Sequence, residues 1–163
     1  MPWTLTRNID EFLAAAEDHL QAEPVLHTVP LTVLDSLRKR GPAAYGDDAP
    51  VYGWHESAGR QIDGAFLQTP PFPLLVATLP SGSVADLIAR LSSEAGLPAV
   101  VNLPAAAEAD FGAAWARAAR GSTTASQRSR LYRLDRPVRP DPAPPGVARV
   151  AGRGAGNCSS TGT

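Results

Sequence analysis

The sequence predicts one mixed α+β domain in which a central mixed sheet is flanked by about four helices. Three observations support this class. The chain has 163 residues, 44% hydrophobic and 19% charged, which are the proportions of one globular domain with its own core. Apolar residues follow helical spacing in some segments and form short strand-like runs in others. From residue 135 the composition becomes proline-rich, which marks the end of this domain.

Charge and composition exclude several classes of function. The formal net charge of -1 provides no basic excess for binding nucleic acid or a membrane surface. No apolar run approaches the roughly 18 residues of a membrane span, and the N-terminus lacks the apolar core of a signal peptide. The single cysteine, Cys158, forms neither an internal disulfide nor a thiolate zinc site. We therefore expect a cytoplasmic protein that binds neither nucleic acid nor membrane, without a metal site.

Two helices are expected near the N-terminus. Asn8 can cap the first, and Glu11 is spaced to reach back to the N–H of the cap residue. Helical apolar spacing then continues to about Gln21. The second helix is expected from near Thr28 to Gly41, where the glycine ends it.

The middle of the chain changes to strand-like patterning. Residues 51–54 and 61–68 predict a β-hairpin around a polar turn that contains Gly59. Prolines interrupt residues 70–73, because they cannot donate to a strand ladder. The continuous apolar run at residues 74–79 then predicts a buried central strand.

Helices and strands alternate in the rest of the domain. Ser83 can cap a third helix, with Asp86 at the capping-box position. Residues 99–103 predict a short buried strand, and a fourth helix is expected at about 105–120. The alternating pattern at residues 131–134 predicts a last strand.

These elements define three regions. The domain covers residues 1–134, and a proline-rich linker follows at 135–146. Residues 147–163 begin as a second domain and run into a Gly-, Ser-, Thr- and Ala-rich tail without apolar periodicity. We expect that tail to be disordered.

Four segments stand out by their order and spacing: LHTVPL at 26–31, PVYG at 50–53, FLQTPP at 66–71 and QRSRLYRL at 127–134. Together with the element order, they resemble the degenerate N-terminal half of tandem GNAT-family N-acetyltransferases, over residues 1 to about 150. The resemblance implies a GNAT-like acyl-CoA N-acyltransferase fold, with a mixed sheet splayed around a cleft. It also implies acetyl transfer from acetyl-CoA to an amine of a small-molecule or peptide acceptor.

The cofactor loop departs from this family. An active GNAT half carries Arg/Gln-x-x-Gly-x-Gly/Ala between its central strand and the next helix, where backbone N–H groups bind the pyrophosphate of acetyl-CoA. Here residues 79–84 read LPSGSV, which is too short, has one glycine and loses a donor at Pro80. Acetyl-CoA is therefore implied for the full-length family but is not expected to bind this chain, which we expect to be inactive alone.

The tail suggests why a catalytic half would be missing. Common GC-rich codons for residues 154–163 allow a shifted frame that reads Arg-Gly-Glu-Leu-Leu-Val-Asp-Trp-Tyr. This peptide resembles the first helix of a catalytic GNAT half. The hypothesis is that a frameshift replaced the C-terminal half, the partner of this domain, and the nucleotide sequence downstream tests it.

The candidate substrate-cleft residues are His27, Thr28 and Trp54. His27 and Thr28 stand at the start of the second helix, which often lines the cleft in the fold that the resemblance implies. Trp54 could form the wall of a pocket. The alternatives are that the lone histidine caps or packs and that the tryptophan belongs to the core. No residue is assigned to catalysis or to cofactor binding.

Other candidates have structural interpretations. His55 and Glu56 are expected in a solvated hairpin turn. Arg128 and Arg130 share one face of the expected last strand and Arg133 the other, which favours protection of a sheet edge over an anion site. Residues 152–156 mimic a phosphate loop but are low in complexity.

The favoured function is the N-terminal part of a GNAT-type N-acetyltransferase. One alternative is a non-enzymatic binding or dimerisation module. Another is a single-domain acetyltransferase with an unusual cofactor loop.

Overall fold

The computed structural model describes residues 2–119, 121–136, 138, 141–142 and 145–146. The chain divides into two compact units, Met1–Leu131 and Tyr132–Thr163. All helices and strands of the described residues lie in the first unit. None of these helices is long and apolar enough to cross a membrane. Cys158, the glycine-rich segment at 152–156 and the hypothetical frameshift lie outside the described residues.

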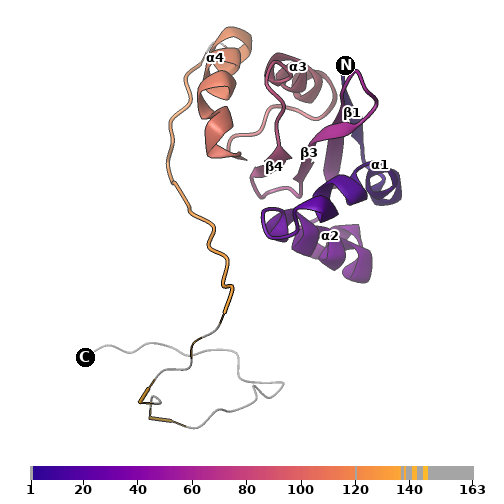
Figure 1. Cartoon of the computed structure of the whole chain (residues 1–163). Helices are drawn as coiled ribbons and strands as arrows, with labels where there is room; N and C mark the ends of the chain where they lie inside the picture. Colours follow the sequence, from indigo (N-terminus) through magenta and orange to yellow (C-terminus); the bar gives the residue numbers. More distant parts are fainter. Residues whose placement is uncertain (1, 120, 137, 139–140, 143–144, 147–163) are drawn as a thin grey trace, which may run out of the picture. The chain divides into compact units, whose positions relative to one another are not determined.

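The first unit contains one five-stranded sheet and four α-helices (Figure 1), which confirms the mixed α+β class. In chain order the elements are β1 (Trp3–Thr6), α1 (Ile9–Ala22), α2 (Thr28–Arg40), β2 (Val51–Glu56), β3 (Ile62–Gln68), β4 (Leu74–Thr78), α3 (Val84–Glu94), β5 (Val101–Asn102) and α4 (Glu108–Ala119). Two 3-10 turns, η1 (Pro42–Tyr45) and η2 (Ala105–Ala107), follow α2 and β5.

The sheet has the strand order β1-β2-β3-β4-β5. Its first three pairings are antiparallel, and β4 pairs with β5 in parallel through the crossover helix α3. This last pairing is short, since it joins only Leu74 to Val101 and Leu75 to Asn102. From Val76 onward β4 pairs only with β3, so β4 and β5 diverge toward the carboxyl end of β4.

Two β-bulges lie near this open end of the sheet. His55 faces Gly64 while the next residue of β2 faces Ile62, so Asp63 is an extra residue in β3. Between β3 and β4, Ala77 is likewise the extra residue. A bulge leaves its extra residue unpaired and re-aims nearby side chains. The bulges therefore set where the side chains of this end of the sheet point.

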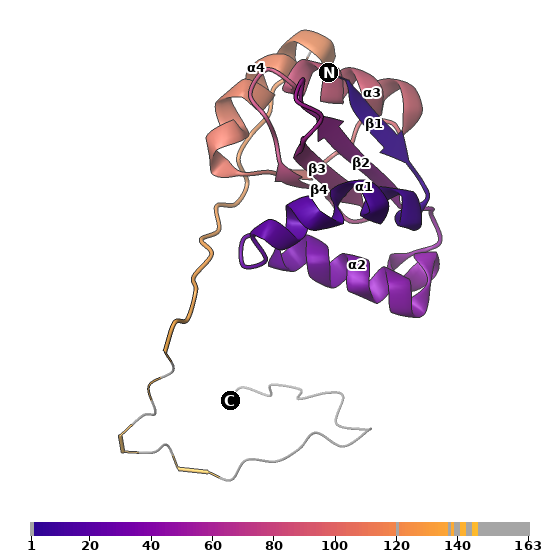
Figure 2. The same ribbon diagram turned by 45° about the vertical axis from the view of Figure 1, so that its right-hand side comes forward.

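Helices cover both faces of the sheet (Figure 2), with α1 and α2 on one face and α3 on the other. Because side chains alternate along each strand, the core is divided into one cluster on each face of the sheet. Tyr52 and Leu67 pack with the α1–α2 face, whereas Val51 and Phe66 pack with the α3 face. A further cluster joins α3 to α4 through Ile88 and other buried residues.

The strand β1 was not expected from the sequence. Four residues carry too little alternation to predict a strand, and β1 is defined by its antiparallel pairing with β2. Its first residue, Trp3, is fully buried in the core on the α3 face. The start of the chain is thus an integral edge of the sheet.

The strand predicted at residues 131–134 is wrong. Residues 122–134 contain no strand, and the side chains of Leu131 and Tyr132 are exposed. A strand needs a hydrogen-bonded neighbour, and the described part of the chain provides none. Arg128 instead donates a hydrogen bond to Glu108, 2.9 Å away, so the interpretation of the arginines as edge protection also fails.

Both predicted capping boxes differ from the structure. The side chain of Asn8 caps α1 as expected, but Glu11 accepts a hydrogen bond from the hydroxyl of Thr6. Ser83 makes no side-chain cap bond to α3, because its hydroxyl bonds the backbone of Pro80. Residues that shortly precede each helix therefore bind these side chains in place of the helix ends.

Candidate functional site

A pocket of about 440 Å³ opens where β4 and β5 diverge. One wall is formed by the end of β4 and the turn into α3, at residues 77–81. The facing wall is formed by Pro104, η2 and Asp110 in the first turn of α4. Asp63 from the bulge of β3 and Leu26 from the turn between α1 and α2 complete the lining. Ligand sites in α/β proteins favour such points beyond the carboxyl ends of strands that separate.

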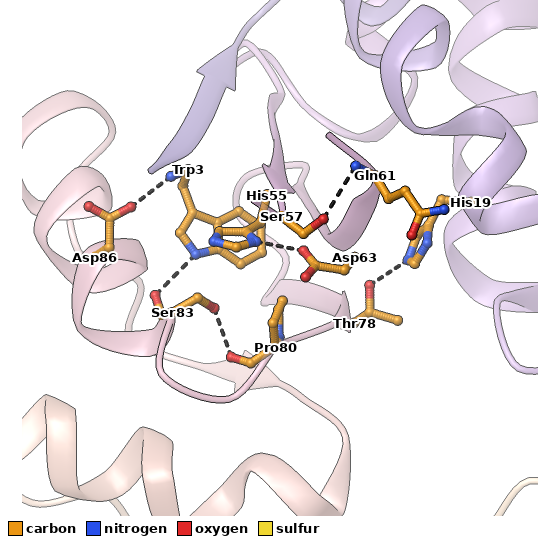
Figure 3. A network of polar contacts seen from close by, with 10 residues as sticks. All are labelled: Trp3, His19, His55, Ser57, Gln61, Asp63, Thr78, Pro80, Ser83 and Asp86. Atoms are coloured by element: carbon orange, nitrogen blue, oxygen red, sulfur yellow. Dashed lines mark hydrogen bonds and ion pairs between the residues drawn. The ribbon is translucent and has the colours of Figure 1, made fainter. Parts of the chain in front are cut away.

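A buried histidine orients the carboxylate of Asp63 (Figure 3). The Nδ1–H of His55 donates to Oδ1 of Asp63 over 2.6 Å. The side chain of His55 is buried, whereas that of Asp63 remains partly exposed toward the pocket. A short charge-assisted bond of this kind fixes one carboxylate oxygen and leaves the other for a ligand. The expectation of a solvated turn at His55 is therefore wrong.

The other two histidines lie behind Thr78, which also lines the pocket. The Nε2 of His19 shares a hydrogen bond of 2.8 Å with the hydroxyl of Thr78 (Figure 3). The ring centroid of His27 is 5.8 Å from that of His19. Buried His27 donates from Nδ1 to the carbonyl oxygen of Leu20, and its other ring nitrogen, Nε2, is also buried. That Nε2 has no hydrogen-bond partner among the described residues.

The pocket is acidic. Among the residues that the structure describes, the charged side chains that line it are those of Asp63 and Asp110, and no lysine or arginine lines it. Burial, together with the neighbouring His27, lowers the pKa of His19 below its usual 6.5, although Asp63 opposes this shift. This shift of the pKa disfavours the charged form of His19. In the described part of the chain, no group of three metal-ligating side chains is arranged to hold an ion.

Trp3 of β1 makes two hydrogen bonds to the start of α3 (Figure 3). The carboxylate of Asp86, in the first turn of α3, accepts the backbone N–H of Trp3 over 2.6 Å. The indole N–H of Trp3 donates to the carbonyl oxygen of Ser83 over 3.1 Å. An anion at a helix N-terminus is stabilised by the positive end of the helix dipole. Here that place is taken by a side chain of the protein.

The candidate residues from the sequence do not line this pocket. His27 is buried behind His19, as described above. Thr28 is exposed, and its hydroxyl donates to the carbonyl oxygens of Pro24 and Val25. Half-buried Trp54 packs against the α1–α2 core, with its ring centroid 6.5 Å from that of Phe12. Of the three candidates, only His27 thus lies next to the hydrogen-bonded pair of His19 and Thr78.

The residues that the sequence did not single out are Asp63, Thr78, Asp110 and His19. Asp63 is brought to the pocket by a bulge, which depends on the register between two strands. Asp110 reaches it only because β5 diverges from β4. His19 had one usable signal, since it stands one position before the buried Leu20 in α1. A histidine beside an apolar stripe lies at the boundary of the core, where its ring can reach buried polar groups.

The titration of His19 predicts a specific dependence of stability on pH. The unfolded side chain has a pKa near 6.5 and the folded one a lower pKa, so the unfolded state binds more protons between these values. Stability is therefore full above pH 6.5 and is lost as the pH falls through the folded pKa. We expect His19→Gln, whose amide can still bond Thr78, to reduce the loss of unfolding free energy between pH 7.5 and 5.5 relative to the wild type. Denaturant titrations of both proteins measure it, and an equal loss in both would contradict the assignment.

Comparisons with known proteins give no relative: no family model, no curated protein and no solved structure matches the chain.

Proposed function

We propose that this domain is the noncatalytic half of a GNAT-type N-acetyltransferase, in which a second GNAT domain binds acetyl-CoA. The observation that carries the proposal is the divergence of β4 and β5 after two paired residues, in a sheet whose other neighbours are antiparallel. This agrees with the mixed, splayed sheet that the sequence resemblance implies. The single cysteine of the chain supports a cytoplasmic location.

Three features argue against acetyl-CoA in this half. Pro80 removes a backbone donor from the turn after β4. The carboxylate of Asp86 already lies in the first turn of α3, where a pyrophosphate would need free N–H groups. Asp63 and Asp110 add negative charge to the same pocket, which repels the phosphates of the cofactor. The domain therefore contributes a wall of the cleft and leaves the cofactor to its partner.

The same charges suit the acceptor side of the reaction. An amine acceptor is protonated at neutral pH before it is bound, and the carboxylates of Asp63 and Asp110 attract that cation. The hydroxyl oxygens of Thr78 and Ser81 line the pocket as further acceptors for an ammonium group. The acceptor would thus be collected on this half and presented to the acetyl-CoA of the catalytic half.

Calorimetric titration of the purified chain tests the proposal. We expect no heat of binding with acetyl-CoA and weak, on the order of millimolar, binding of a linear diamine such as putrescine. In Asp63→Asn and Asp110→Asn the diamine affinity is expected to fall by about fivefold for each carboxylate, because an exposed ion pair contributes on the order of 1 kcal/mol. Asp35→Asn, at an exposed i,i+4 pair on α2, is the control and leaves it unchanged.

Micromolar binding of acetyl-CoA would overturn the noncatalytic assignment. Diamine binding that survives both substitutions would show that this pocket is not the acceptor wall.

A further inference from the structure

A second pocket, of about 590 Å³, opens at the start of α1. It is lined by residues 6–9, where β1 leads into α1, and by Leu37, Pro42 and Tyr52. The acidic pocket described above lies past the other end of this helix, where it is lined by Leu26. The two pockets share no lining residue, and the 14 residues of α1 span about 20 Å between them. A ligand of the second pocket is therefore separate from the site between β4 and β5.

Arg7 carries the only charge among the described side chains that line this pocket. It follows Thr6, the partner of Tyr52 in the pairing of β1 with β2. Its Nη1 donates to the carbonyl oxygen of Ala49 over 3.1 Å, which holds the guanidinium at the pocket. No carboxylate of the described residues forms an ion pair with it. Because a guanidinium has five N–H donors in a planar fork, Arg7 keeps donors for the carboxylate of a ligand.

The hydroxyl of Tyr52 is a second donor for this pocket. Tyr52 is 2% exposed, and its ring stacks on that of Phe12 with the centroids 5.3 Å apart. Its hydroxyl bonds to no described residue, yet the only completely enclosed side-chain polar atom without a partner among these residues is Nε2 of His27. The hydroxyl of Tyr52 therefore reaches open space in the pocket that this residue lines. Burial raises the pKa of Tyr52 to about 12, so the hydroxyl keeps its proton at neutral pH and can donate a hydrogen bond.

The other walls of the pocket are mainly apolar. Leu37 is buried, Ile9 packs against the core on the α1–α2 face, and Pro42 begins η1. A hydrocarbon chain placed against them is removed from water. Directly after Ile9, Asp10 and Glu11 add negative charge in the first turn of α1, which disfavours a polyanion such as phosphate. One cation, one neutral donor and apolar walls together fit a monoanion that carries a short hydrocarbon chain.

We propose that this pocket binds a small monocarboxylate, whose oxygens accept hydrogen bonds from the guanidinium of Arg7 and the hydroxyl of Tyr52. Its hydrocarbon chain lies against Ile9, Leu37 and Pro42. A volume of about 590 Å³ is in the range of pockets that bind small molecules. A free aliphatic acid and the C-terminus of a peptide with an apolar last residue share this chemistry. The proposal is independent of the acetyltransferase assignment, because it concerns a different pocket.

An NMR titration of the ¹⁵N-labelled full chain tests the proposal. We expect hexanoate to bind with a Kd on the order of millimolar and to shift the amide signals of residues 6–9, Leu37 and Tyr52. Hexylamine, which carries the opposite charge, and hexanamide, which carries none, should leave these signals in place at the same concentration. Inorganic phosphate should bind more weakly than hexanoate.

A second ligand distinguishes the two sources of the carboxylate. N-acetylalanyl-leucine presents the same group as the C-terminus of a peptide, with an apolar side chain beside it. Tighter binding of hexanoate identifies a free aliphatic acid as the ligand, and tighter binding of the dipeptide identifies a peptide C-terminus. Both results support the carboxylate site.

Two substitutions remove the donors one at a time. Arg7→Gln removes the charge and Tyr52→Phe removes only the hydroxyl, and each is expected to weaken hexanoate binding by about fivefold. The matched controls are Arg90→Gln on α3 and Tyr45→Phe in η1, which do not line the pocket and should bind hexanoate as the wild type does. Because no described residue bonds the hydroxyl of Tyr52, Tyr52→Phe should also keep the urea midpoint of the wild type. A purely structural role of this hydroxyl would lower the midpoint instead.

An absence of amide shifts around this pocket at about 50 mM hexanoate would overturn the proposal. So would hexylamine or phosphate that binds there as tightly as hexanoate. Folded Arg7→Gln and Tyr52→Phe variants that bind hexanoate like the wild type would also overturn it.

Discussion

Replacing Trp3 by alanine is expected to lower the free energy of unfolding by about 3–5 kcal/mol, the range for a fully buried aromatic side chain. Trp3 has no exposed surface and packs against the rings of His55 and Phe66, with centroids 5.5 and 5.6 Å away. It also holds the start of α3 through Ser83 and Asp86. The substitution removes the largest side chain of the core on the α3 face and leaves the carbonyl oxygen of Ser83 without its donor.

Two variants separate these contributions. Trp3→Phe keeps an aromatic ring but loses the indole N–H, and we expect it to cost about 1–3 kcal/mol. Trp54→Ala removes the same side chain type from a half-buried position and should cost less than Trp3→Ala. Urea unfolding monitored by circular dichroism measures all three. A loss below about 1 kcal/mol for Trp3→Ala would mean that β1 is not docked in solution.

Replacing Gly64 by alanine is expected to destabilise the protein by about 1–3 kcal/mol through overpacking. A Cβ atom at Gly64 would lie 2.7 Å from Cη2 of Trp3, 2.9 Å from Cβ of His55 and 2.9 Å from Cδ of Pro80. None of these atoms ends a flexible side chain, so the sheet, β1 or the turn into α3 must shift. Because Pro80 lines the pocket, the same substitution should also weaken diamine binding.

Gly59→Ala is the matched control for this substitution. A Cβ atom at Gly59 would meet only the hydroxyl oxygen of Ser57, at an ordinary 3.8 Å. We expect its unfolding free energy to stay within about 0.5 kcal/mol of the wild type. Equal effects of the two substitutions in urea titrations would contradict the close packing around Gly64.

The helices were predictable because their signal is local. The apolar stripe of α1, at Phe12, Leu13, Ala16 and Leu20, is buried as its spacing predicted. The apolar residues of α3 at Val84, Leu87, Ile88 and Leu91 have helical spacing and are buried in the same way. The residues of each stripe lie within a few turns of one helix, so their spacing can be recognised without knowing the rest of the fold.

The sheet edges were not predictable on the same basis. The segment at 131–134 has a strand-like pattern and remains unpaired, whereas Trp3–Thr6 has a weaker pattern and forms β1. A strand exists only where a neighbour meets its backbone donors and acceptors. That neighbour is a property of the folded chain.

The sequence by itself determined the mixed α+β class and the helices, because composition and short-range spacing encode them. Only the tertiary structure decided that Asp63 is turned by a bulge toward the pocket, and that Asp86 binds a residue 83 positions away instead of capping its own helix. Register and long-range hydrogen bonds depend on strands that meet only after folding. For that reason the candidate site could be identified from the fold and could not be predicted from the sequence.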